Sequence, residues 1–230
     1  MKKYPFYYYP NPRFMIESIS VVGDFNNWDW QIHPMEKDEQ GLWQTEVELE
    51  PGEYKYKYLV NNEIRLNDPS ANLYYPDKNG EVTSVLFISS DGSRMINTQK
   101  YEIKLENYSL FSKVLDEAPK QSRRLFILPR EDRAVTRLEF SIVEGIHTIS
   151  VLWYEPGQKL YKAMENILWS PAVKDKNPLV YWFWLELIKG KMTQGLWTLK
   201  LFIDGAFLLE DYFEIIYLPN ELSDALISKE

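Results

Sequence analysis

The sequence predicts an all-β protein built of two β-sandwiches in tandem, and three observations lead to this prediction. Most segments alternate apolar and polar residues with a period of two, which is the pattern of half-buried strands. Turn residues separate these segments at short intervals, as they do in sandwich folds. Aromatic residues make up 15% of the chain, a share typical of β-rich folds. A length of 230 residues suits two small domains better than one large one.

The first domain is expected at residues 1–92. Its alternating strands are separated by Pro51-Gly52, which indicates a turn, and by Asn61-Asn62, which indicates a tight hairpin. Residues 89–93, with the sequence SSDGS, are interpreted as a linker. The strands of this set are expected at 17–23, 42–49, 54–60 and 82–88.

The second domain is expected at residues 93–230 and has the same character. Residues 179–188 are apolar on both faces, which favours a central strand, whereas residues 108–120 could hold one helix. Gly-Leu-Trp opens a strand at 41–43 and again at 195–197. This echo is either a common way to begin a strand or a sign of two related modules. Further strands are expected at 125–129, 135–143, 148–157, 195–205 and 212–218.

Composition excludes several classes of function. The formal charge is −8, with nine basic against fifteen acidic residues in 1–95 and seventeen against nineteen in the remainder. Neither half is basic, which argues against nucleic acid or an anionic membrane as the main partner. No apolar run approaches the length of a transmembrane helix, and the first residues lack the apolar core of a signal peptide. We therefore expect a cytoplasmic protein.

Catalytic and metal-binding motifs are also missing from the sequence. There is no cysteine, and the two histidines, His33 and His147, cannot form one of the usual zinc sites and are interpreted as incidental. Neither a nucleophile elbow nor a phosphate-binding or dinucleotide-binding loop occurs. We expect no catalytic residue, no metal and no cofactor.

The most informative stretch is VVGDFNNWDW at residues 21–30, which places two tryptophans in a turn. Over residues 15–90 the chain resembles the glycogen-binding module of the AMP-activated protein kinase β subunit. It is similar also to the N-terminal modules of glycogen branching enzymes and isoamylases, which form carbohydrate-binding module family 48. The resemblance implies an immunoglobulin-like β-sandwich of the early-set type and a preference for α-1,4-glucan. The pieces that carry it are GDFNNW at 23–28, Pro34-Met35, Gly41-Leu42-Trp43, Pro51-Gly52-Glu53-Tyr54 and Asp68-Pro69.

The resemblance also implies a sugar site. Trp28, next to Asn27, matches the tryptophan that stacks on a glucose ring, and a flat indole is suited to the apolar face of a sugar. Lys57 matches the lysine that hydrogen-bonds sugar hydroxyls. Without the resemblance, Lys55 and Lys57 would be interpreted as a solvated strand face.

The implied site is only partly present. Ile64 stands where the family has its second stacking tryptophan, and Thr83 or Ser84 stands where it has an asparagine. An isoleucine buries area but offers no flat platform. Trp30, where the family usually has a non-aromatic residue, is either a second platform or a lid over the core.

These observations favour a non-catalytic α-glucan-binding protein, with maltooligosaccharides as further ligands. An alternative is an interaction or scaffold protein that kept the sandwich, lost the sugar, and contacts a protein partner or a second copy through aromatics such as those in YPFYYYP. A third reading is a subunit that targets a separate glucan-active enzyme to glycogen. The second half is similar to bacterial immunoglobulin-like accessory domains and carries no chemical motif. Its tryptophans are expected in the core or at an interface: Trp153, Trp169, Trp182, Trp184 and Trp197.

Overall fold

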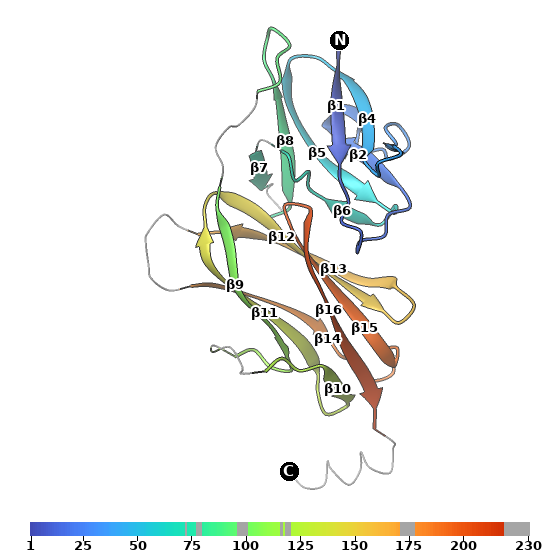
Figure 1. Cartoon of the computed structure of the whole chain (residues 1–230), viewed down its shortest axis with the longest axis vertical. Helices are drawn as coiled ribbons and strands as arrows, with labels where there is room; N and C mark the ends of the chain where they lie inside the picture. The colour runs from blue at the N-terminus through green and yellow to red at the C-terminus, as the bar shows by residue number, and fades with distance from the viewer. Residues whose placement is uncertain are drawn as a thin grey trace.

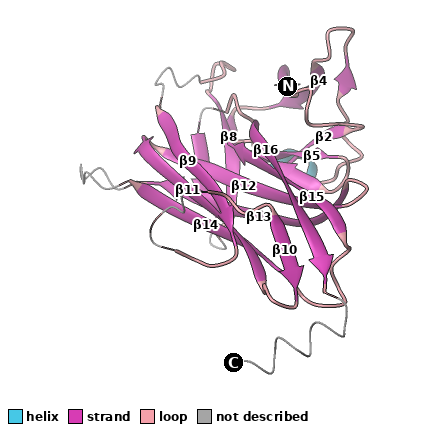
Figure 2. Cartoon of the chain, turned by 60° about the horizontal axis from the view of Figure 1, so that its bottom comes forward, coloured by secondary structure: helices cyan, strands magenta, loops and turns pink. Residues whose placement is uncertain are grey.

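A computed structural model confirms the all-β fold and its two immunoglobulin-like sandwiches, which lie one above the other in Figure 1. Residues 1–71, 73–76, 80–95, 101–115, 117, 121–170 and 178–218 are described. Within these ranges the only helix is a single 3-10 turn, η1 (Asp24–Asn26), and strands account for nearly all regular structure (Figure 2).

The first sandwich packs a three-stranded sheet, in the order β1-β4-β3, against a sheet in the order β2-β5-β8-β7, with β6 paired to β5. Tyr56 and Tyr58 of β5 are fully buried between the sheets, as the alternation of this strand predicts. The strands are β1 (Lys2–Tyr8), β2 (Ile19–Gly23), β3 (Glu36–Lys37), β4 (Trp43–Leu49), β5 (Gly52–Val60), β6 (Ile64–Leu66), β7 (Leu73–Pro76) and β8 (Val82–Ile88).

The N-terminal aromatic segment is a strand, which the sequence analysis did not foresee. In β1, Tyr4, Phe6 and Tyr8 are buried in the first core. Only Tyr7 and the following Tyr9 are exposed, by 48% and 73%. Strand β1 is an edge strand, where a proline such as Pro5 is tolerated. Most of the aromatics expected at the surface in YPFYYYP therefore belong to the core.

The second sandwich has sheets in the orders β14-β11-β9 and β10-β16-β15-β12-β13, with β10 parallel to β16. This arrangement is that of an immunoglobulin-like sandwich, with a tryptophan, Trp153, buried on β12. Its ring contacts Phe213, and Trp197 is also fully buried, so aromatic packing fills a core that has no disulfide. The strands are β9 (Ile103–Phe111), β10 (Leu125–Leu128), β11 (Arg133–Val143), β12 (Ile146–Glu155), β13 (Lys159–Trp169), β14 (Leu179–Glu186), β15 (Gly195–Ile203) and β16 (Ala206–Tyr217).

Two expectations for this half are wrong. The segment at 179–188 is an edge strand and not a central one, and its outer face is partly covered by a connecting segment, since Trp182 Nε1 donates to the Leu115 carbonyl at 3.4 Å. The possible helix at 108–120 instead continues β9 to Phe111; residues 116 and 118–120 lie outside the described residues. Trp169 and Trp184, expected in the core or at an interface, lie outside the core, with exposures of 50% and 39%.

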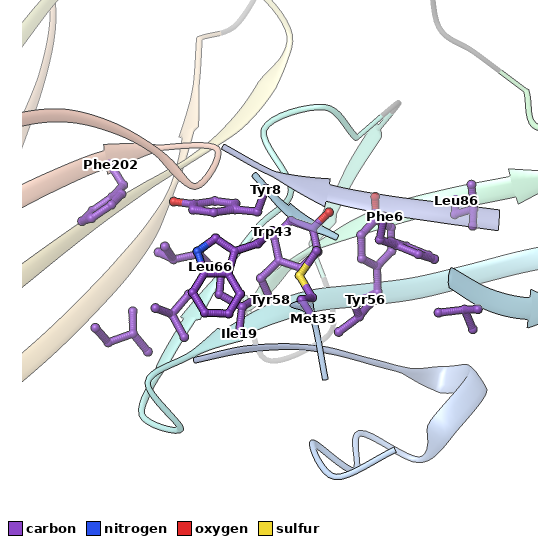
Figure 3. Packing of buried hydrophobic residues seen from close by; sticks show 14 of the residues in the cluster. Phe6, Tyr8, Ile19, Met35, Trp43, Tyr56, Tyr58, Leu66, Leu86 and Phe202 are labelled. Atoms are coloured by element: carbon purple, nitrogen blue, oxygen red, sulfur yellow. The ribbon is translucent and has the colours of Figure 1, made fainter. Parts of the chain in front are cut away.

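The two sandwiches share one core cluster at their junction. Leu152, Tyr154 and Phe202 of the second sandwich belong to the cluster that fills the first, and Figure 3 shows Phe202 beside Tyr8 at its edge. The Tyr8 hydroxyl donates to the Gly205 carbonyl at 3.0 Å, and the ring centroids of Phe14 and Phe202 are 4.8 Å apart. Apolar packing and hydrogen bonds thus fix how the sandwiches dock.

His147 is not incidental, because it lies in a charged contact beside this junction. Its Nδ1 is 2.6 Å from Asp204 Oδ2, and its Nε2 is 2.6 Å from the Glu144 carbonyl. Burial lowers the pKa of His147, but the hydrogen bond and charge of Asp204 outweigh that effect and leave the pKa raised. Protonated His147 therefore stabilises the fold.

Because the pKa of His147 is higher in the folded state, its stabilisation is complete below the unfolded value of about 6.5 and is lost as pH rises through the folded value. We expect the melting temperature to fall from pH 6 to pH 8 by a component that His147→Gln removes. Thermal melts of both proteins across this range test this. Identical pH profiles would show that His147 contributes nothing.

Candidate functional site

The loop that follows β2 is organised by Asn26. The side-chain Nδ2 of Asn26 donates to the Val21 carbonyl at 2.9 Å, and its Oδ1 accepts from the Gly23 N–H at 2.9 Å. The same Nδ2 lies 3.0 Å from His33 Nδ1, which makes the ring nitrogen the acceptor. Burial lowers the pKa of His33, which favours this neutral form. The first asparagine of FNNW and His33 are thus positioning residues that the sequence analysis left without a role.

Two consecutive residues of this loop are left-handed. Asn27 has φ 53° and Trp28 has φ 62°. Asparagine tolerates this region, but a tryptophan rarely occupies it, and such local strain is concentrated at functional sites. Backbone hydrogen bonds hold the conformation, with Trp28 N–H donating to the Gly23 carbonyl at 3.0 Å.

The loop carries its aromatic side chains at the surface. Trp28 is partly buried, whereas Trp30 is 45% exposed and Ile32 is 52% exposed. Asn27 is exposed beside them. Trp30 is therefore not a closed lid over the core, and the predicted pair of tryptophans lies on one accessible loop.

Lys57 does not join this loop as an available hydrogen-bond donor, which corrects the expectation from the resemblance. Its side chain is only 2% exposed, and its Nζ lies 3.0 Å and 3.1 Å from the two carboxylate oxygens of Glu165. A second carboxylate, that of Glu81, is 3.1 Å from the same Nζ. Lys57 is neither solvated nor free to meet a sugar.

Glu165 comes from β13 of the second sandwich and is itself held in place. Its carboxylate accepts the Val82 N–H at 3.3 Å, and the Ser150 hydroxyl lies 3.5 Å away. Lys57, Glu81 and Glu165 therefore link the outer face of the first sandwich to the edge of the second. The lysine that the resemblance assigns to sugar binding is used here for domain docking.

Ile64 and Ser84 are also placed away from the surface. Ile64, 3% exposed, packs in the first core cluster and offers no platform. Ser84 is fully buried, accepts the Asp68 N–H at 2.8 Å and donates to Asn67 Oδ1 at 3.0 Å. Thr83 is 5% exposed and donates to the Tyr75 carbonyl. None of these side chains can replace the missing tryptophan or asparagine at a sugar.

The Asp68-Pro69 motif has a structural role. The Asp68 carboxylate accepts the Tyr56 hydroxyl at 2.8 Å and the Ser70 N–H at 2.8 Å. Burial raises the pKa of Asp68, while the hydrogen bonds from Ser70 and Tyr56 act in the opposite direction. Hydrogen bonding of this kind is what a buried carboxyl requires.

The described part of the chain holds no group of three or more His, Asp or Glu side chains arranged to bind a metal ion. No helix within it is long and apolar enough to cross a membrane.

Fold and site together define a protein of two docked immunoglobulin-like sandwiches, the first of which carries a strained, exposed tryptophan loop. Residues 15–94 match the family model described as the glycogen recognition site of AMP-activated protein kinase. This part of the chain is therefore similar to that glycogen recognition site.

The same region is similar to glycogen branching enzymes. It is 44% identical over 64 residues to the 1,4-alpha-glucan branching enzyme GlgB of Nitrosomonas eutropha, covering 25% of this chain and 9% of that enzyme. The corresponding enzyme of Prochlorococcus marinus is 33% identical over 88 residues, covering 35% of this chain and 12% of the enzyme. The chain thus spans only a small part of the relatives that it matches.

Two solved structures are also similar. An immunoglobulin-like protein from Pseudomonas aeruginosa matches with a TM-score of 0.34 and 15% identity, over 50% of this chain and 97% of that one. The DNA glycosylase AlkC of Pseudomonas fluorescens, bound to DNA with an abasic site analogue, matches with a TM-score of 0.35 and 11% identity, over 51% of this chain and 31% of that one.

Proposed function

We propose that the protein is a non-catalytic α-glucan-binding protein, and that the Trp28–Trp30 loop is its contact with sugar. The strained backbone of Trp28 beside an exposed Trp30, within a region similar to the glycogen recognition site, carries this proposal. An indole covers the apolar face of a glucose ring and removes that face from water.

The affinity of this loop should be low. Half-burying one indole at ~25 cal/mol per Å² contributes roughly 2–3 kcal/mol, and association entropy offsets much of it. Because Lys57 is engaged by Glu165, it adds no hydrogen bond at the sugar edge. A single ring would then bind in roughly the millimolar range. Two rings on one loop gain from shared orientation, so affinity should rise with glucan length.

Trp30→Ala tests whether the second ring of the loop contributes to glucan binding. We expect it to weaken maltoheptaose binding by roughly 1–2 kcal/mol with little loss of stability, because the ring is half exposed. Trp169→Ala is the matched control, since this tryptophan is 50% exposed but lies on the second sandwich. Calorimetric titration gives the affinity and a thermal melt gives the stability.

Trp28→Ala should abolish most of the binding by the loop, provided that circular dichroism shows the fold intact. Equal affinities for the Trp28, Trp30 and Trp169 variants would exclude the loop as the glucan contact. An unchanged affinity with a large loss of stability in Trp30→Ala would instead make that ring part of the core.

A second candidate function is that of an interaction or scaffold protein. The burial of Lys57 against Glu165 favours it, because the sandwich has lost part of the family's sugar site to domain docking. Exposed Tyr7 and Tyr9 provide aromatic surface for a protein partner or a second copy. Light scattering that shows a strict monomer, together with clear glucan binding, would count against this alternative.

A further inference from the structure

A cleft lies at the junction of the two sandwiches, and no residue of the Trp28–Trp30 loop lines it. Its volume is about 900 Å³, and it is enclosed by residues 10–16, by Lys37 and Trp43 of the first sandwich, and by β15 and β16 of the second. Ligand sites commonly occupy clefts of about 300–1,000 Å³ at domain interfaces. Residues of both sandwiches, Gln158 among them, line this junction cleft, so it exists only while the sandwiches are docked.

A buried ion pair forms one wall of the junction cleft. The Lys200 Nζ lies 3.6 Å from Glu210 Oε1, and the two side chains are only 7% and 12% exposed. The same Nζ donates to the Arg13 carbonyl at 3.1 Å and lies over the rings of Phe14 and Tyr154. An apolar pair of similar size would often stabilise a protein as well as such a buried pair. The presence of the Lys200–Glu210 ion pair beside a cleft therefore indicates a role in binding.

The rim of the junction cleft combines a ring with planar polar groups. Tyr212 is 44% exposed, and its hydrogen bond to Glu210 raises the pKa of the phenol, so the ring stays neutral and is held beside the ion pair. The Gln158 amide donates to Thr198 Oγ1 at 3.0 Å, which fixes the amide while leaving its oxygen as a further acceptor. The Arg13 guanidinium lies close enough to affect Tyr212 electrostatically.

These groups suit a polyhydroxylated ligand. The two polar atoms of a carboxylate, an amide or a guanidinium are spaced like two neighbouring hydroxyls on a sugar ring, so each group can bind such a pair. The Tyr212 ring offers an apolar surface for the face of the sugar. Of the charged side chains that line the cleft, Arg13, Lys37 and Lys200 are basic and Glu210 is acidic, and Glu210 balances the charge of Lys200.

We propose that the junction cleft is a binding site for a short neutral oligosaccharide, in which Tyr212 stacks on one sugar ring while Glu210 and Gln158 hydrogen-bond its hydroxyls. This site is separate from the Trp28–Trp30 loop and does not depend on it. Both sandwiches contribute to it, which gives the second sandwich a part in recognition.

The test uses the full chain with the loop disabled. The Trp28→Ala/Trp30→Ala protein is titrated with maltoheptaose and with cellohexaose by calorimetry, before and after Tyr212→Ala is added. We expect at least one of the two oligosaccharides to bind the loop-disabled protein, and Tyr212→Ala to weaken that binding about tenfold, as loss of a stacking ring should. Tyr212→Phe keeps the ring and should retain most of the affinity. Melting temperatures confirm that each variant is folded.

The outcomes separate this site from the loop. Binding that survives the loop variants but falls with Tyr212→Ala supports the junction cleft, even if the loop itself proves inactive. Loss of all binding in Trp28→Ala/Trp30→Ala, or binding that Tyr212→Ala leaves unchanged, overturns it. Tighter binding of a sulfated oligosaccharide than of either neutral one would also overturn it, because it would make the cleft an anion site.

Discussion

Lys57→Met should lower the free energy of unfolding by about 2–4 kcal/mol, because it removes the buried cation that the carboxylates of Glu81 and Glu165 share. Methionine keeps most of the aliphatic volume, so the change reports mainly on charge. The expected loss of stability is smaller than for a fully buried ion pair because the side chains of Glu165 and Glu81 are 20% and 42% exposed. Urea unfolding of both proteins measures the difference.

Lys55→Met is the matched control for this prediction. Lys55 lies two residues away on the same face of β5, where its Nζ is 4.9 Å from the centroid of the Tyr75 ring, and no carboxylate of the described residues pairs with it. We expect that variant to lose less than about 1 kcal/mol. Adding Glu165→Leu to Lys57→Met should restore part of the lost stability, since it removes the carboxylate whose two oxygens both contacted the lysine.

The Lys57 variant also separates the two candidate roles of this residue. Domain docking predicts a loss of stability with glucan affinity unchanged in the folded fraction. If Lys57→Met instead weakened maltoheptaose binding while leaving the unfolding curve in place, the lysine would act on sugar as it does in the family.

Gly205→Ala should cost about 3 kcal/mol of stability, because this glycine is pressed against the other sandwich. A Cβ at residue 205 would lie 1.9 Å from the carbonyl oxygen of Asn67, and the backbone there has φ +81°. The backbone at Gly205 cannot move away easily, since the Tyr8 hydroxyl donates to the Gly205 carbonyl. The substitution should loosen the junction, and urea unfolding measures the loss.

Gly157→Ala is the control that measures the backbone strain without the clash. Gly157 also has a positive φ, +90°, but nothing lies within 4 Å of the position where its Cβ would be. That variant should lose only about 1–2 kcal/mol, the strain of a left-handed residue. Equal losses for the two variants would mean that the contact between Gly205 and Asn67 does not hold the sandwiches together. The clash in Gly205→Ala should also lower the affinity of the junction cleft for any ligand.

Much of the first sandwich could be predicted from local pattern. Alternation in 54–60 placed Tyr56 and Tyr58 on the buried face, and 82–88 is a strand with the expected bounds. The motif FNNW located the loop that exposes Trp30. Strand β1 escaped prediction because Pro5 and the consecutive tyrosines hide the alternation, although every second side chain from Tyr4 to Tyr8 is buried. An edge strand tolerates such a sequence, and no local signal shows that a segment will lie at an edge.

By itself, the sequence determined the all-β class, the tandem sandwiches, the resemblance of residues 15–90 to the glycogen-binding module and the tryptophan loop, because each depends on neighbouring residues or on a short motif. The tertiary structure alone decided the fate of Lys57. Alternation correctly placed this lysine on the outer face of β5, but it could not reveal that Glu165, 108 residues away in the chain, covers and pairs with it. Strand periodicity fixes the direction of a side chain, whereas burial depends on what packs against that face. The junction cleft has the same origin, since its walls come from segments that meet only when the two sandwiches dock.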